Sequence, residues 1–362
     1  MIYSSMKEVE SWVDKMPDEY KSSYNRFKRM TEVLTNEPEP LVGQTPKEVI
    51  WTKNKTKLYR YQPAVKKTNK VPLLMVYALI NKPYILDLAP GNSLIEHLTN
   101  QGHDVYLLDW GTPGYEDRHN KLEDYIMDYI PRAAKKVLQT SDAKEFSMLG
   151  YCMGGTMTSI FAALHPELPI RNLIFMTSPF DFSDAGHYTN WLDKRHFNLD
   201  KLVDTMGNIP HEMIDFGNKL LNPIPNFYGP YMSLADRADN EGFVEGWKLM
   251  QKWLKDGIPF PGEAYRQWIR DFYQENKLIN DKLYVRGHQV KLSNIKANIL
   301  NIAASRDNIA APKQVEPLND KVSSKSKAFH LLETGHVSVA VGRKAINETF
   351  PLVDKWLRDH SK

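Results

Sequence analysis

The hexapeptide GYCMGG at residues 150–155 contains Cys152, the only cysteine among the 362 residues of the chain. Glycine stands two positions before this cysteine and two positions after it, which is the spacing of a nucleophile elbow with cysteine in place of serine. The nucleophile of an elbow lies on a sharp turn between a strand and a helix, so its neighbours must be small. The alternative is a structural cysteine buried beside glycines of a packed helix. A strand-like stretch before the motif and a helix-like stretch after it favour the elbow.

An elbow needs a general base and an acid that orients this base, and along the chain they follow in the order nucleophile, acid, histidine. Asp307 comes just after the apolar run ILNIAA, and His336 comes just after the run FHLL. Both positions are ends of predicted strands, so we expect Asp307 to be the acid and His336 the base. Asp181, which follows an earlier predicted strand, could supply the acid instead. The weaker histidine candidates, none of which follows directly on a predicted strand, are His165, His288 and His330.

Two backbone N–H groups are expected to form an oxyanion hole for the developing negative charge. The first belongs to Met153, the residue after the predicted nucleophile. The second should come from an early strand-to-helix loop at residues 78–83, where Ile80 or Asn81 is the candidate. This loop lacks the consecutive glycines found in lipases, and Asn81 could equally be a simple turn residue.

A cysteine nucleophile suits acyl transfer better than ester hydrolysis. Exchange between a thiolate and a thioester breaks and makes bonds of similar energy, and the acyl-cysteine that forms is still activated towards an alcohol. His336, oriented by Asp307, would first take the proton of the Cys152 thiol and later the proton of an incoming hydroxyl group. Water must be kept away from such an intermediate, and an apolar cap would do this.

The elements that must position these residues follow an α/β pattern. Strand-like and helix-like stretches alternate from residue 71, which predicts a mostly parallel sheet flanked by helices. Near alternation of apolar and polar residues around Lys53-Asn54-Lys55 predicts a hairpin before this sheet. The alternation stops at residues 182–285, where prolines, aromatic residues and helical stretches predict an inserted cap. The predicted core therefore consists of residues 41–181 and 286–362.

Residues 1–40 are predicted to form a separate helical segment. Its apolar residues recur every three or four positions and so share one face of a helix, namely Trp12, Met16, Tyr20, Tyr24, Phe27, Met30 and Val33. Such a face either covers the chain's own core or binds a partner chain. Farther along, residues 121–140 are predicted to form a helix with a kink or early break at Pro131.

Composition restricts the classes of function. The net charge of +3 gives no support for nucleic-acid binding, and a single cysteine excludes an intramolecular disulfide and a multi-cysteine metal site. The chain has no stretch of 18 apolar residues, and its start lacks a basic region followed by an apolar run. We therefore expect a cytoplasmic protein without a transmembrane segment or a signal peptide.

Several motifs together resemble the polyhydroxyalkanoate (poly-3-hydroxybutyrate) synthases. The resemblance rests on GYCMGGT, SRDNIAAP, ETGHVSVAVG, LIFMTSPFDF and the long stretch INKPYILDLAPGNSLIEHLTNQGHDVYLLDWGTP. It covers most of residues 45–360. The chain lacks the long N-terminal extension of single-subunit synthases and is more similar to the catalytic chain of the two-subunit types, classes III and IV, with class IV favoured.

The resemblance implies an α/β-hydrolase fold with Cys152 as nucleophile, Asp307 as acid partner and His336 as base. It implies (R)-3-hydroxyacyl-CoA substrates, short-chain and 3-hydroxybutyryl-CoA above all, with release of CoA and growth of a polyester at the granule surface. No metal or prosthetic group is implied. The implied partners are a second, different subunit of the R type and a second copy of the chain, and residues 1–40 could bind the former.

Two alternatives remain at this point. One is a cysteine-type hydrolase of the same fold, such as a thioesterase, a dienelactone hydrolase or a polyester depolymerase. The other is a non-catalytic protein that coats granules.

Overall fold

The computed structural model describes residues 12–361 except residues 14, 36–37 and 68. The chain divides into two compact units. The larger one, called the core unit below, consists of Val42–Leu221 and Asp256–Lys362. The smaller one, called the helical unit, combines the residues up to Leu41 with Asn222–Lys255.

Within the described residues, the core unit is built on a sheet of eight strands. In spatial order the strands are β1 (Glu48–Lys53), β2 (Thr56–Tyr61), β6 (Val105–Asp109), β3 (Leu73–Val76), β7 (Phe146–Tyr151), β8 (Ile170–Met176), β11 (Asn298–Ala304) and β12 (Lys327–Leu332). The last six of these run parallel to one another, whereas the pairs β1–β2 and β2–β6 are antiparallel. Every residue of β3 and β7 is buried, as expected for parallel strands that helices cover on both faces. The prediction of a mostly parallel α/β sheet is confirmed.

The predicted hairpin is formed by β1 and β2. Its turn lies at Asn54 and Lys55, and Asn54 has a φ of 52°. Asparagine is one of the few residues that adopt this left-handed conformation readily, because its short side chain can bond to the nearby backbone. The hairpin extends the parallel sheet, since β2 pairs with β6 in antiparallel register from Lys57 to Tyr61.

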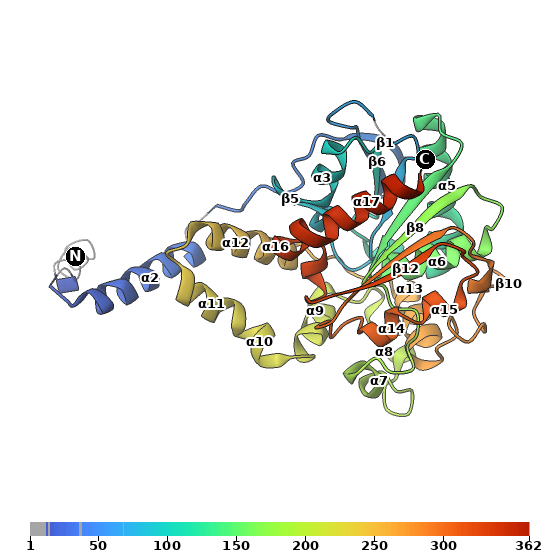
Figure 1. Ribbon diagram of the computed structural model, residues 1–362. Coiled ribbons are helices and arrows are strands. Elements are labelled where there is room, and N and C mark those ends of the chain that lie inside the picture. The colour runs from blue at the N-terminus through green and yellow to red at the C-terminus, as the bar shows by residue number, and fades with distance from the viewer. Residues whose placement is uncertain (1–11, 14, 36–37, 68, 362) are drawn as a thin grey trace. The chain divides into compact units, whose positions relative to one another are not determined.

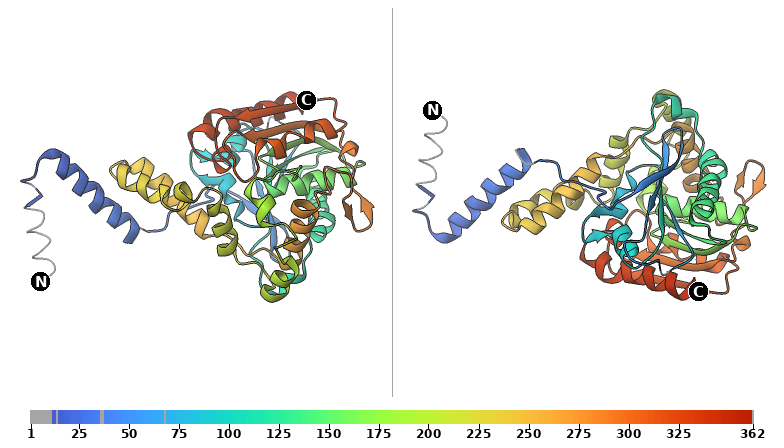
Figure 2. Two further views of the ribbon diagram at one scale, coloured as in Figure 1. Left: turned by 90° about the horizontal axis from the view of Figure 1, so that it is seen from below. Right: turned by 90° about the horizontal axis from the view of Figure 1, so that it is seen from above.

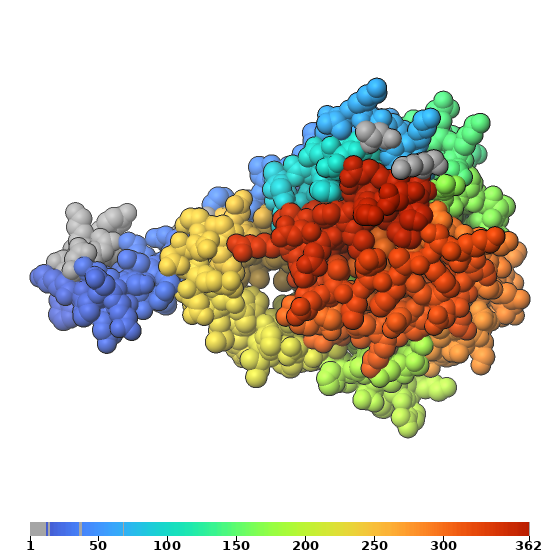
Figure 3. Space-filling model, viewed as in Figure 1, coloured from blue at the N-terminus to red at the C-terminus, as the bar shows by residue number. Residues whose placement is uncertain are grey.

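Helices cover both faces of the sheet (Figures 1 and 2). Helices α3 (Leu94–Asn100) and α17 (Phe350–His360) pack against each other on one face, and α5 (Ile130–Ser141) and α6 (Met153–Leu164) cover the other. The C-terminal helix is amphipathic as predicted, because it buries Phe350, Val353, Asp354 and Leu357 on one side. Its opposite side forms part of the surface of the core unit seen in Figure 3.

The helix predicted around Pro131 is interrupted just before that proline. A short helix α4 (Leu122–Asp124) passes into a π-helical turn at Tyr125–Tyr129, and α5 then begins with Pro131 in its first turn. Proline has no N–H group and its ring clashes with the carbonyl four residues earlier, so a wider turn before it relieves the conflict. The same solution recurs at Ala345–Thr349, directly before Pro351 in α17.

The segment between β8 and β11 is mostly helical. In the core unit it contributes α7 (His187–Trp191), α8 (Leu199–Met206), α9 (His211–Leu220), α13 (Gly262–Gln267) and a π-helical turn η4 (Trp268–Gln274). In the helical unit it contributes α10 (Pro223–Phe227), α11 (Gly229–Arg237) and α12 (Glu241–Lys255). Residues 182–285, expected as one cap, are thus shared between the two units.

The helical unit also contains α2 (Asp18–Thr35), which lies in the segment predicted to be helical. Val33 of α2 packs with Leu234 and Val244 in a small apolar cluster. Nearer its start, Tyr20 is 63% exposed and Phe27 is 67% exposed. Only the end of the predicted apolar face is therefore covered within this unit. Residues 1–11, 14 and 36–37 of the predicted segment lie outside the described residues.

Candidate active site

Cys152 lies on the turn between β7 and α6, at the centre of the sheet. Its φ of 54° and ψ of −129° are strained for a residue with a side chain, which is typical of a nucleophile elbow. The flanking glycines are sterically required. A Cβ atom on Gly150 would lie 2.3 Å from the Cα of Gly155, and one on Gly154 would lie 2.2 Å from the carbonyl oxygen of Val76. The local geometry expected from the motif is present.

The structure brings His336 and Asp307 together beside the elbow. Asp307 follows β11, and its Oδ1 atom accepts hydrogen bonds from the backbone N–H groups of Ile309 (2.8 Å) and Ala310 (2.9 Å). These two bonds fix the carboxylate so that Oδ2 lies 2.6 Å from Nδ1 of His336. On its other side the His336 ring lies close enough to Cys152 for the charge of the sulfur to raise the pKa of the imidazole. The imidazole of His336 therefore stands between the carboxylate that orients it and the sulfur of Cys152.

The electrostatics of this group favour a protonated His336. Burial lowers the pKa of His336, but the charges of Asp307 and Cys152 and the hydrogen bond to Asp307 outweigh burial, so its pKa lies well above the usual value. An imidazolium between a carboxylate and a sulfur is the charge arrangement of an activated cysteine. The site can hold the proton that the sulfur must lose before it attacks.

The alternative acid and bases lie elsewhere. Asp181 accepts a hydrogen bond from Nδ2 of Asn276 at 2.9 Å and another from the backbone of Ser183 at 2.9 Å, and it has no contact with His336. The remaining candidate bases are found at the end of α6 (His165), in the short strand β10 (His288) and within β12 (His330). None of these contacts the elbow.

A cavity of about 210 Å³ opens at Cys152 and is lined entirely by residues of the core unit. Met153 and Ile80 line it next to Cys152, and Asn81 is not among its lining residues. The carbonyl oxygen of Ile80 accepts a hydrogen bond from Ile258 at 3.1 Å, which fixes the loop that carries Ile80. Of the two residues expected to offer the second oxyanion donor, Ile80 is therefore the one that the structure places at the site.

Most of the cavity wall is apolar. The apolar lining comes from the segment between β8 and β11 and from the loop after β11, and it includes Leu192, Phe197, Ile209, Ile214, Phe260, Trp268, Ile269, Ile309 and Ala310. Four side chains add polar atoms, namely Tyr188, Asn218, Tyr265 and Tyr273. Sequence reasoning predicted an aromatic cap but assigned no role to these four. They come from four elements, α7, α9, α13 and η4, and no motif or period connects them in the sequence.

Tyr151, the residue before the candidate nucleophile, was also missed. Its hydroxyl group donates a hydrogen bond to the carbonyl oxygen of His336 at 2.9 Å, and its ring stacks on that of Tyr77 at 5.4 Å between centroids. Burial, followed by the charges of Cys152 and Asp307, raises the pKa of Tyr151 well above its usual value, so the phenol keeps its proton.

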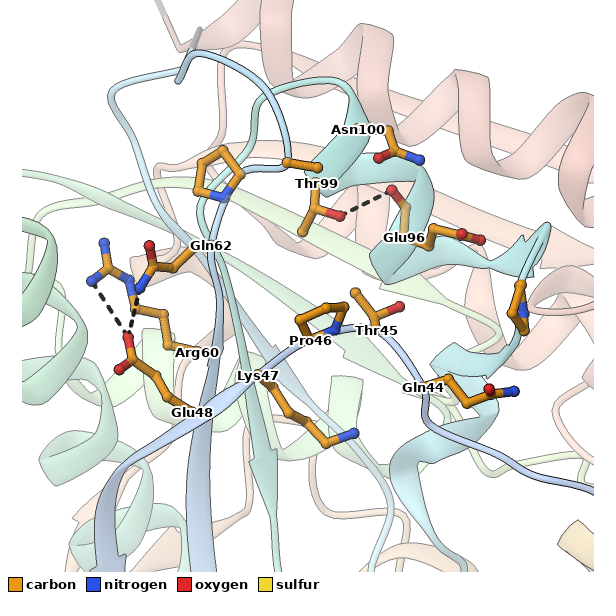
Figure 4. A pocket seen from close by; sticks show the side chains of 13 residues that line it. Gln44, Thr45, Pro46, Lys47, Glu48, Arg60, Gln62, Glu96, Thr99 and Asn100 are labelled. Atoms are coloured by element: carbon orange, nitrogen blue, oxygen red, sulfur yellow. Dashed lines mark hydrogen bonds and ion pairs between the residues drawn. The ribbon is translucent and has the colours of Figure 1, made fainter.

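A second cavity of the core unit, of about 570 Å³, has charged side chains in its lining and does not include Cys152 (Figure 4). Its cationic side chains are already neutralised. Arg60 bonds to the buried carboxylate of Asp104 at 3.0 Å, and Lys47 lies 3.9 Å from that of Asp87. Because both cations are paired with carboxylates and the lining contains no cysteine, serine or histidine, this cavity is a poor candidate for the reaction.

Two kinds of feature are absent from the described residues. No three histidine, cysteine, aspartate or glutamate side chains among them are placed to hold a metal ion. No helix among them is both long enough and apolar enough to cross a membrane.

Comparison with known proteins identifies two families. Residues 71–342 match the family described as "alpha/beta hydrolase fold", and residues 24–98 match "Poly-beta-hydroxybutyrate polymerase (PhaC) N-terminus". Among solved structures, an esterase from Thermogutta terrifontis has a TM-score of 0.53 at 14% identity and covers 88% of this chain and 100% of its own. A monoacylglycerol lipase from Paleococcus ferrophilus has a TM-score of 0.51 at 17% identity and covers 84% of this chain and 99% of its own. These two likenesses concern the fold alone.

Curated relatives are named "Poly(3-hydroxyalkanoate) polymerase subunit PhaC". The protein of Thiocystis violacea is 34% identical over 98% of this chain and 100% of its own length. That of Allochromatium vinosum is 34% identical over 96% of this chain and 98% of its own. That of Haloferax mediterranei is 39% identical over 90% of this chain, which spans 66% of the Haloferax protein. The match extends along nearly the whole chain and includes the elbow, so the chain belongs to the family of poly(3-hydroxyalkanoate) polymerase subunits built on the α/β-hydrolase fold.

Proposed function

We propose that the chain polymerises (R)-3-hydroxyacyl groups, taken from their CoA thioesters, into a polyhydroxyalkanoate through an acyl-cysteine intermediate at Cys152. The observation that carries this proposal is the hydrogen-bonded pair His336–Asp307 beside the nucleophile elbow at Cys152, in a chain 34% identical over 98% of its length to a polymerase subunit. Short-chain monomers such as 3-hydroxybutyryl-CoA fit a reaction cavity of only about 210 Å³.

In the first half of the reaction, the Cys152 sulfur attacks the thioester carbonyl and forms a C–S bond. The negative charge moves to the carbonyl oxygen, where the N–H groups of Met153 and Ile80 would stabilise it. Collapse of this intermediate breaks the bond to the CoA sulfur, and the leaving thiolate takes the proton from the His336 imidazolium. The products are acyl-Cys152 and free CoA.

In the second half, a hydroxyl oxygen attacks the acyl-cysteine carbonyl. His336 takes the proton of this hydroxyl, and Asp307 stabilises the imidazolium that results. The new ester bond forms as the bond to the Cys152 sulfur breaks, which regenerates the imidazolium beside the sulfur. The apolar wall of the cavity disfavours water as the competing nucleophile, so ester formation prevails over hydrolysis.

The activity is tested by feeding 3-hydroxybutyryl-CoA to the purified chain, with and without a co-expressed second subunit. Release of CoA with formation of polymer is the expected result. Release of CoA with formation of free 3-hydroxybutyrate would instead identify a cysteine-type hydrolase. The variant Cys152→Ala should release no CoA, and unchanged CoA release by this variant would exclude the proposed mechanism.

We further propose that α2 binds the second subunit and that the complex works at the granule surface. Support comes from Tyr20 and Phe27, which expose 63% and 67% of their surface on the same helix. The double variant Tyr20→Ser, Phe27→Ser should lose the partner in a co-purification, whereas the control Lys21→Ser on the same helix should retain it. Retention of the partner by the double variant would contradict this proposal. Self-association into dimers can be measured on the same samples.

A further inference from the structure

Two tyrosines face each other inside the reaction cavity. Tyr188 comes from α7 and Tyr273 from the π-helical turn η4, and both line the cavity that contains Cys152. Their rings meet edge to face, with 5.6 Å between centroids and an angle of 70°. Burial is the largest cause of the raised pKa of both phenols, followed by neighbouring tyrosines and then by the charge of Cys152. Both side chains therefore lie close enough to the sulfur to interact with its charge.

The hydroxyl group of Tyr188 is already committed as a donor. It gives its proton to Oδ1 of Asn218 in a short hydrogen bond of 2.6 Å. A phenol has one proton to donate and lone pairs to accept. Towards the cavity, Tyr188 can therefore act only as a hydrogen-bond acceptor.

The hydroxyl group of Tyr273 is a free donor. It has no hydrogen-bond partner within the part of the chain that the structure describes. The ring is fixed edge to face by Phe182 at 5.0 Å and by Trp268 at 6.3 Å, in addition to Tyr188. Burial raises the pKa of Tyr273 well above its usual value, so the phenol is neutral and retains the proton.

We propose that Tyr188 and Tyr273 together bind the 3-hydroxyl group of the substrate, with Tyr188 accepting its proton in a hydrogen bond and Tyr273 donating to its oxygen. An alcohol is the group that donates one hydrogen bond and accepts another, so it satisfies both tyrosines at once. This inference rests on the proposed function and specifies how the substrate class is recognised. A ketone could accept from Tyr273 only, and a methylene group could bond to neither.

Selectivity follows from the apolar surroundings. A polar pair that lines a mostly apolar cavity loses its hydrogen bonds to water when a substrate enters. A substrate without the hydroxyl would leave this pair unsatisfied, which costs more than the loss of one ordinary bond. The same contact orients the hydroxyl, because its proton points to Tyr188 and one lone pair to Tyr273.

The test is a set of equilibrium binding measurements in a Cys152→Ala background, in which the thioesters stay intact. The full chain, with its second subunit if the polymer assay requires one, is titrated with 3-hydroxybutyryl-CoA, acetoacetyl-CoA and butyryl-CoA. We expect the parent to bind 3-hydroxybutyryl-CoA about 5- to 20-fold more tightly than butyryl-CoA. Tyr188→Phe should weaken binding of the hydroxy compound alone, roughly 3- to 10-fold. Tyr273→Phe should weaken binding of both oxygenated compounds.

Tyr265→Phe is the matched control. Tyr265 lines the same cavity, but burial alone raises its pKa, to about 12, with no contribution from Cys152. This variant should keep the parent's preference among the three thioesters. The inference is wrong if the parent shows no preference, if neither Tyr188→Phe nor Tyr273→Phe reduces it, or if Tyr265→Phe reduces it equally. Failure of the proposed function would appear separately, as wild-type chain that makes no polymer.

Discussion

The hydroxyl group of Tyr151 donates a hydrogen bond to the carbonyl oxygen of His336 at 2.9 Å. The residue next to the candidate nucleophile thus holds the backbone of the candidate base. Tyr151 ends β7 in the middle of the sheet, and its ring stacks on Tyr77 at an interplanar angle of 10°. The loop that carries His336 is therefore fixed to a central strand of the core unit.

Replacing Tyr151 with phenylalanine tests this connection. Tyr151→Phe keeps the ring stacking but removes the bond to His336, so the imidazole should spend less time aligned with Cys152. A net loss of about 1 kcal/mol corresponds to a roughly 5-fold fall in the rate of CoA release. Tyr61→Phe, at a buried tyrosine distant in the sheet order, should leave the rate unchanged. Equal rates for wild type and Tyr151→Phe would show that the bond is dispensable.

Replacing Asp307 and, in a separate variant, Asp181 with asparagine shows which of the two carboxylates orients His336. Burial lowers the pKa of His336 and the charge of Asp307 raises it, so in Asp307→Asn the pKa of His336 should fall. The imidazolium beside Cys152 would then be lost at neutral pH, and CoA release should fall by about 10²- to 10⁴-fold. Alkylation of Cys152 by iodoacetamide should slow as well and recover at higher pH. Asp181→Asn should retain most of the activity, and the reverse ranking would make Asp181 the acid.

Sequence alone predicted the parts of the site that local sterics and chain order dictate. The elbow could be predicted because a strained turn at Cys152 demands small neighbours. Asp307 and His336 could be predicted because each comes shortly after the end of a parallel strand. The pairing of Tyr188 with Tyr273 could not be predicted. These residues are 85 positions apart in the sequence, and they meet only because the irregular helices between β8 and β11 pack together. The hydrogen bond from Tyr151 to His336 could not be predicted either, because the elbow motif does not specify a partner for the residue before the nucleophile.

The glycines of the elbow allow a test of its sterics. Gly154→Ala would place a methyl group 2.2 Å from the backbone oxygen of Val76, which cannot move without displacing β3. We expect a loss of about 3 kcal/mol or more in the free energy of unfolding, or insoluble protein. Gly246→Ala in α12 is the matched control, because a Cβ atom there meets nothing within 4 Å. It should stabilise its helix by about 0.5–1 kcal/mol, as measured by urea unfolding. A soluble, fully stable Gly154→Ala variant would contradict the packing described here.

His103 gives the core unit a specific dependence of stability on pH. Its ring is buried, with Nε2 2.8 Å from Oδ1 of Asp354 and Nδ1 3.2 Å from Nδ2 of Asn69. Because an amide nitrogen can only donate, Nδ1 must be the acceptor, and the neutral ring donates from Nε2. Burial lowers the pKa of His103, assisted by the charge of Arg358, although the carboxylate of Asp354 opposes the shift.

The sign of the effect follows from this direction. A histidine whose pKa is lowered by folding binds fewer protons in the folded than in the unfolded chain, so its contribution to stability is present above about pH 6.5 and is lost as the pH falls towards the lowered pKa. The loss reaches about 1.4 kcal/mol per pH unit. The advantage of wild type over His103→Gln in the free energy of unfolding should therefore shrink between about pH 7.5 and pH 5.5. Urea titrations at both values measure it, with the exposed His288→Gln as control. An advantage that stays constant or grows towards acid pH would show that His103 is not held neutral.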